Sequence, residues 1–168
     1  MSYPFRTNTN DRCKDTHFIV YERYNRCKII VHGRQNTQKG FYCEDFFKPK
    51  IVWGNLNLEG AYSYAPDGMF VNAPSPFITT SNIAILHILN SKIANYYIRS
   101  LGVTRNGGYF EYKPMFVEKL PVPKCGFERL CNYPIQPNVE QEHEIEHIIH
   151  SIYGLSVQET EYIENMQL

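Results

Sequence analysis

The segment His143-Glu144-Ile145-Glu146-His147 has the spacing of a metalloprotease motif. On a helix, its two histidines would lie on one face and could bind zinc, with Glu144 as the general base. The surrounding sequence favours a simpler interpretation, because this helix is rich in Glu and His and carries an isoleucine stripe on its other side. We therefore expect a solvated helix face and no metal site, and a small zinc hydrolase stays open only as an outlying alternative.

A second segment, Asn72-Ala73-Pro74-Ser75, is faintly similar to the motif with which adenine methyltransferases hold a flipped base. Its second residue is Ala and its fourth is Ser, so the stacking ring is missing and we expect a plain turn. No glycine-rich cofactor loop follows a strand, and no nucleophile stands at a meaningful spacing from a base. The sequence thus predicts no catalytic residue and no cofactor site in this chain.

Basic and amide side chains mixed with aromatic residues remain as the functional signal. Lys and Arg neutralise phosphates, whereas Arg, Asn and Gln can pair with base edges. The candidate DNA-binding residues are Arg34, Gln35, Asn36, Lys48, Lys50, Arg105, Asn106, Tyr109 and Lys113.

The net charge of zero hides an uneven distribution of charge. Residues 1–50 hold ten Lys and Arg against five Asp and Glu, whereas residues 126–168 hold one against eight. A basic half suits a polyanionic partner, and an acidic tail suits a different, non-DNA contact. Five cysteines without a C-x-x-C pair indicate reduced thiols in a cytoplasmic protein, and the lack of a long apolar run argues against a membrane span.

The hydrophobic pattern predicts strands first and helices last. We expect strands within residues 16–32, a polar loop over 33–40, a strand that begins just after Pro49 and includes Trp53, and short strands over 60–80. One long helix over 82–100 leads to a short strand over 108–112. After a proline-rich connector over 121–137, a helix over 139–153 ends at Gly154, and Ser156 opens a last short helix.

The order of several short segments resembles one known family. These segments are HGR (32–34), FFKPKIVW (46–53), LNSK (89–92) and RNGGYFEYKPMFVEKLPVP (105–123), followed by EIE (144–146) and SIYGLS (151–156). Over roughly residues 30–168 the chain resembles the TaqI-like C-terminal specificity domain, the target-recognition part of type IIG restriction–modification enzymes.

The resemblance implies an α+β fold, with a twisted mixed or antiparallel sheet backed by a helix and a C-terminal helical segment. Residues 1–124 would form the DNA target-recognition domain, and residues 125–168 a connector and helices packing on it or on a methyltransferase.

The resemblance also implies that the intact enzyme joins this part to adenine methyltransferase and endonuclease domains, which would use AdoMet and Mg²⁺. Duplex DNA and those two domains are the expected partners, with no membrane. We expect the Arg105–Lys113 segment to face DNA and the loops over 33–40 and 54–76 to set sequence choice. A docking module with little DNA contact of its own is the alternative.

Overall fold

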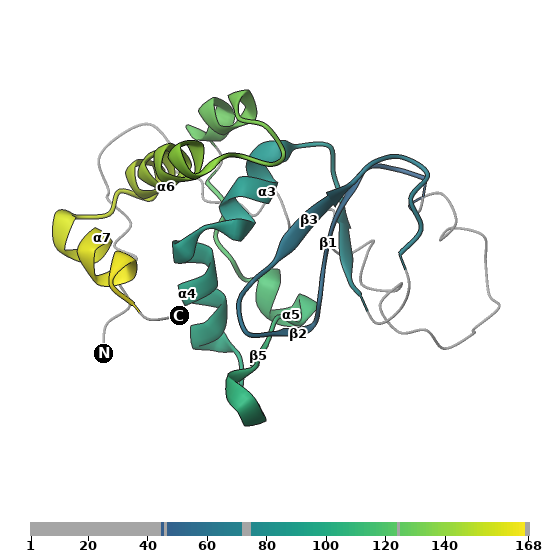
Figure 1. Cartoon of the computed structure of the whole chain (residues 1–168), viewed down its shortest axis with the longest axis horizontal. Coiled ribbons are helices and arrows are strands. Elements are labelled where there is room, and N and C mark those ends of the chain that lie inside the picture. The colour runs from purple at the N-terminus through teal and green to yellow at the C-terminus, as the bar shows by residue number, and fades with distance from the viewer. Residues whose placement is uncertain (1–44, 46, 72–74, 124, 167–168) are drawn as a thin grey trace.

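The computed structural model describes residue 45 and residues 47–71, 75–123 and 125–166. The protein is built in three layers, of which the strands form the first (Figure 1). The helices α3 (Ile83–Asn90) and α4 (Lys92–Leu101) form the middle layer, and the C-terminal helices α6 (Val139–Tyr153) and α7 (Val157–Glu164) form the third. The strands and loop that we expect over residues 16–40 lie outside the described residues.

The main sheet has three antiparallel strands in the order β3–β1–β4. β1 (Lys50–Trp53) lies between β3 (Tyr62–Ala65) and β4 (Phe77–Thr79), and Ile51 pairs with a residue of each neighbour. β1 begins directly after a proline, as the sequence predicts, because a proline lacks the N–H that an inner strand must donate. α3 packs against β3, so the predicted α+β fold with a helix on the sheet is confirmed.

The expected single helix over residues 82–100 is wrong, because the chain breaks at Ser91. Ser91 has extended backbone angles, φ −72° and ψ 155°, and ends α3 while it caps α4. Its hydroxyl donates to the Ile88 carbonyl at 2.7 Å and accepts from the Ala94 N–H at 3.3 Å. A buried serine can satisfy backbone groups on both sides of the break, so the helix can restart in a new direction.

Helix α6 has the bounds that the sequence predicts, and Ser156 caps α7 as predicted, whereas the cap of α6 at Asn138 was not predicted. Asn138 and Ser156 form capping boxes at the starts of α6 and α7, and Gly154 ends α6 with φ +65°. α6 also packs on the 3₁₀ turn η2 (Phe127–Asn132), which the sequence shows only as part of a connector. Both helices contribute buried isoleucines to the core that α3 and α4 share: Ile145, Ile148, Ile149 and Ile163.

Cys125 is disulfide-bonded, which corrects the expectation that all five cysteines are reduced, whereas Cys131 is an exposed free thiol. Within the described ranges, none of the helices has the length and apolar character needed to cross a membrane.

A partly buried polar cluster joins the N-terminus of α4 to α6 and α7. The Glu146 carboxylate accepts the Lys92 backbone N–H at 2.9 Å, while the Lys92 ammonium pairs with Glu164. His150 Nε2 lies 3.5 Å from Glu146 Oε2. Burial raises the pKa of Glu146 to about 7, although the Lys92 backbone hydrogen bond acts in the opposite direction. The folded protein therefore holds a proton on Glu146 that the unfolded chain releases at lower pH.

Glu146 should make stability fall as pH rises. Its pKa is about 7 in the folded state against an ordinary 4.5, so the loss develops between these two values and is complete above pH 7. Glu146→Gln keeps an acceptor for Lys92 and removes the ionisation. We expect E146Q to be more stable than the wild type at pH 8, by on the order of 2 kcal/mol, and nearly equal to it at pH 4.5.

Urea unfolding across this pH range measures the effect of Glu146→Gln. Glu140→Gln is the matched control, because Glu140 is an exposed carboxylate on the same helix. Parallel stability curves for E146Q and the wild type from pH 4.5 to 8 would contradict the assignment.

Candidate nucleic-acid interface

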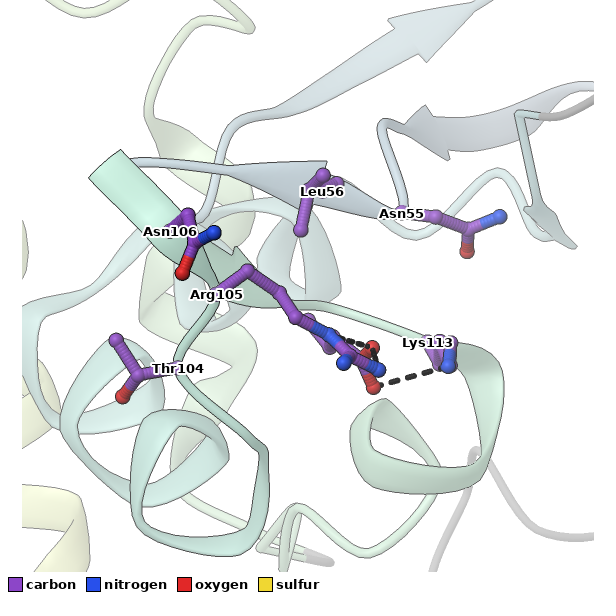
Figure 2. A pocket seen from close by; sticks show the side chains of 7 residues that line it. Asn55, Leu56, Thr104, Arg105, Asn106 and Lys113 are labelled. Carbon is purple, nitrogen blue, oxygen red and sulfur yellow. Dashed lines mark hydrogen bonds and ion pairs between the residues drawn. The ribbon is translucent and has the colours of Figure 1, made fainter. Parts of the chain in front are cut away.

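An open pocket of about 550 Å³ lies where the turn after α4 meets two short strands (Figure 2). The strands β2 (Leu56–Asn57) and β5 (Phe110–Glu111) pair antiparallel, with Leu56 opposite Glu111. The short helix α5 (Pro114–Val117) follows β5. The pocket is lined by Asn55, Leu56, Thr104, Arg105, Asn106, Glu111 and Lys113.

The turn that carries Arg105 and Asn106 is closed by its own backbone. The Arg105 N–H donates to the Tyr109 carbonyl at 2.7 Å, around the 3₁₀ turn η1 (Asn106–Gly108). Gly107 and Gly108 both have φ +80°, a conformation that side-chain-bearing residues rarely adopt. The Gly-Gly pair of the sequence is therefore what allows the chain to turn back into β5.

Glu111 is the electrostatic centre of the pocket. Its side chain is 8 % exposed, and its carboxylate accepts from Arg105 Nε at 2.7 Å and from the Arg105 Nη2 group. Lys113 Nζ lies 2.9 Å from its other oxygen, so the two cationic side chains point toward one another across one carboxylate (Figure 2). The hydrogen bonds from Lys113 and Arg105 hold the pKa of Glu111 below its usual value. One negative charge thus orders two positive ones, and the cluster keeps a formal excess of one positive charge.

Three contacts fix this small sheet to the protein core. The Trp53 indole N–H donates to the Tyr112 carbonyl at 2.6 Å, and the Tyr112 N–H donates to the Asn55 carbonyl at 2.8 Å. The Tyr112 hydroxyl donates to the Asn95 side chain of α4. On the other side of the sheet, the Arg99 guanidinium stacks 3.7 Å over the Phe110 ring. The pocket is therefore built on a buried base.

The predicted residues Arg105, Asn106 and Lys113 come together in this pocket, although seven positions separate the first from the last of them along the chain. Tyr109 belongs to the same turn and is 41 % exposed, but it does not line the pocket. Lys48 lies outside the pocket and pairs with Asp45 at 2.9 Å, with 51 % of its side chain exposed.

Lys50 corrects our expectation of a phosphate contact. Its side chain is fully buried, and its ammonium donates to the Met69 carbonyl at 2.9 Å. Burial lowers the pKa of Lys50, with the Asp67 charge acting in the other direction. Because Lys50 begins the central strand of the sheet, it serves the fold and cannot reach a ligand in this structure. Arg34, Gln35 and Asn36 lie outside the described residues.

Four lining residues were not among the candidates named from the sequence: Asn55, Leu56, Thr104 and Glu111. The first two fall within the loop over 54–76 that we expected to set sequence choice. Glu111 had a usable signal, because it stands two residues from Lys113 near a predicted strand, and such residues share one side. Leu56 had none, since its place opposite Glu111 depends on pairing between segments more than fifty residues apart.

The histidines of the H-E-x-x-H segment do not form a metal site among the residues whose placement is known. His143 and His147 are exposed on α6, and Glu144 accepts a hydrogen bond from the Tyr133 hydroxyl at 2.7 Å. In those parts of the chain, no three His, Cys, Asp or Glu side chains are grouped so that they could hold a metal ion.

Comparison with known proteins assigns the family. Residues 8–122 match the TaqI-like C-terminal specificity domain. The chain belongs to this family. Its members have a DNA-specificity role in restriction–modification enzymes. The match begins upstream of residue 30, where we expected the resemblance to start, and ends before α6 and α7. A comparison with curated proteins found no match.

Gly107 should be needed to keep the turn at the pocket in its closed conformation. Replacing it with Ala places a side chain at φ +80° and should cost about 1 kcal/mol, since left-handed geometry disfavours a Cβ. Asn tolerates this region better and should cost less. Amide hydrogen exchange of Arg105, whose N–H closes the turn, should accelerate in Gly107→Ala and change less in Gly107→Asn. Unchanged protection of Arg105 in G107A would show that the turn does not depend on the glycine.

Proposed function

We propose that this chain is the sequence-specific DNA-recognition domain of a type IIG restriction–modification enzyme. It would position duplex DNA for adenine methylation and cleavage by domains that are not in this chain. The observation that carries the proposal is the pocket at the turn after α4, where Arg105, Asn106 and Lys113 gather around one carboxylate.

The composition of the pocket supports contact with DNA. Arg and Asn are side chains that pair with base edges, and Lys neutralises phosphates. Arg105 and Lys113 remain about half exposed although both are ion-paired, so they can reach a ligand without leaving Glu111. Such a mixture suits a duplex, because the phosphate contacts set the register in which base contacts select sequence.

AdoMet and Mg²⁺ would bind to the methyltransferase and nuclease domains of the parent enzyme. The cytoplasm, where such an enzyme would meet DNA, stays our predicted location. Of the other candidates, Lys48 is suited to a phosphate contact and Tyr109 to a contact at the margin of the pocket.

The alternative is a docking module for a methyltransferase or nuclease, and the exposed acidic side of α6 favours it. Glu140 and Glu144 lie there, one turn apart, near the exposed Val139. Deletion of residues 139–168 would not separate the two functions, because Ile145 and Ile149 of this segment are buried in the core. Substitution of exposed basic residues separates them without disturbing the fold.

Lys113→Ala should weaken duplex binding for all sequences and reduce its salt dependence. If Lys113 contacts one phosphate, the slope of log K against log salt should become smaller by about 0.9. Lys119→Ala is the matched control, because Lys119 is exposed and lies outside the pocket. Fluorescence anisotropy with a labelled duplex at several salt concentrations measures both variants.

Equal binding by K113A and the wild type, with K119A also unchanged, would favour the docking module. A loss in K119A as large as that in K113A would show that general positive charge, and not this pocket, holds the duplex.

A further inference from the structure

We propose that Arg105 reads a guanine in the major groove and that Glu111 is its positioning residue. This inference rests on the proposed function and adds to it the base and the side chain that recognises it. It follows from the way in which the guanidinium is held.

The donors of Arg105 are divided between the protein and the pocket. Arginine has five N–H donors in one plane. Nε and Nη2 both donate to Glu111 Oε1, which occupies the side of the guanidinium next to the side-chain stem. In the described part of the chain, the hydrogen bonds of Arg105 do not use Nη1 or the outer hydrogen of Nη2. These donors form the end-on edge, which matches the N7 and O6 acceptors that guanine presents in the major groove.

Glu111 also fixes the plane of this edge. Its carboxylate is nearly buried, and its backbone lies in β5, which is held to the core through Trp53 and Tyr112. An arginine whose plane is fixed before binding loses little rotamer freedom when it pairs with a base. A planar guanidinium edge can also pair with a phosphate, but Lys113, on the other carboxylate oxygen, already supplies a positive charge for one.

Leu56 gives the pocket an apolar wall. It lies opposite Glu111 in the β2–β5 pairing and remains 49 % exposed. An exposed leucine beside a fixed guanidinium suits an apolar contact in the major groove, such as one with a thymine methyl group, better than it suits a hydrated phosphate. Figure 2 shows Leu56 on the strand above the Arg105 side chain, so both could face the same groove.

Selection from a duplex library with a randomised central segment tests the inference on the full chain. The wild type should enrich a motif that contains an invariant G·C pair. In Arg105→Lys, which keeps the charge, that one position should relax by on the order of ten- to a hundredfold in relative affinity while the rest of the motif is retained. Lys113→Ala should weaken binding and leave the motif intact.

Glu111→Gln separates positioning from folding. Removal of the negative charge should maintain or increase binding to non-specific duplex, while preference at the same G·C pair falls. A purely structural residue would instead lower both kinds of binding together. The thermal midpoint of E111Q checks that the variant is folded.

Replacement of the selected guanine by 7-deazaguanine removes the N7 acceptor and so tests the hydrogen bond between Arg105 and this base. The replacement should weaken wild-type binding several-fold and have no further effect on Arg105→Ala, because the two changes remove one hydrogen bond. A wild-type motif that Arg105→Lys leaves unchanged, or equal losses for 7-deazaguanine in both proteins, would overturn the assignment of Arg105 alone. No motif at all from the wild type would overturn the proposed function itself.

Discussion

The break at Ser91 is the constraint on which the other parts of the structure depend. Each residue around it holds a different element. The Asn90 side chain accepts the Tyr62 N–H at 2.9 Å and donates to the Tyr62 carbonyl at 3.0 Å, so it pairs with β3 as a neighbouring strand would. Ser91 satisfies backbone groups of both helices. Lys92 uses its N–H on Glu146 of α6 and its ammonium on Glu164 of α7. Three consecutive polar residues thus join the sheet to the C-terminal helices through the middle layer.

This junction also determines where the pocket lies. Because α4 restarts at Lys92, Asn95 comes to face the loop after β2, where it accepts from the Gly60 N–H at 3.3 Å and from the Tyr112 hydroxyl. At the other end of α4, Gly102 passes close to β5: a Cβ there would lie 3.1 Å from the Glu111 carbonyl. Any side chain at this position would push away the strand that carries Glu111. The helix therefore positions the Arg105 turn from both of its ends.

The sequence predicts local features of this fold well and its long-range pairings poorly. Capping boxes at Asn138 and Ser156 are local signals, and the bounds of α6 and α7 follow from them. The break at Ser91 was missed because the apolar spacing continues across it, and only burial of the hydroxyl makes a serine cap there. Lys50 was misassigned for the same kind of reason, since a lysine just after a proline looks exposed until its strand is paired on both sides.

At the candidate site, too, the residue types could be predicted from the sequence and their arrangement could not. Arg105, Asn106 and Lys113 could be named from residue type, because few side chains suit phosphates and bases. Their mutual arrangement could not, since it depends on an acidic residue that a search for basic ones passes over. In the DNA contact that we propose, a carboxylate in the pocket would reduce the attraction to phosphate, which is a disadvantage for affinity alone. It becomes useful where orientation matters more than charge, because a guanidinium held in one plane discriminates between hydrogen-bond patterns that a mobile cation cannot distinguish. The buried Glu111 is therefore the feature of this pocket that argues for selection of sequence over general attachment to DNA.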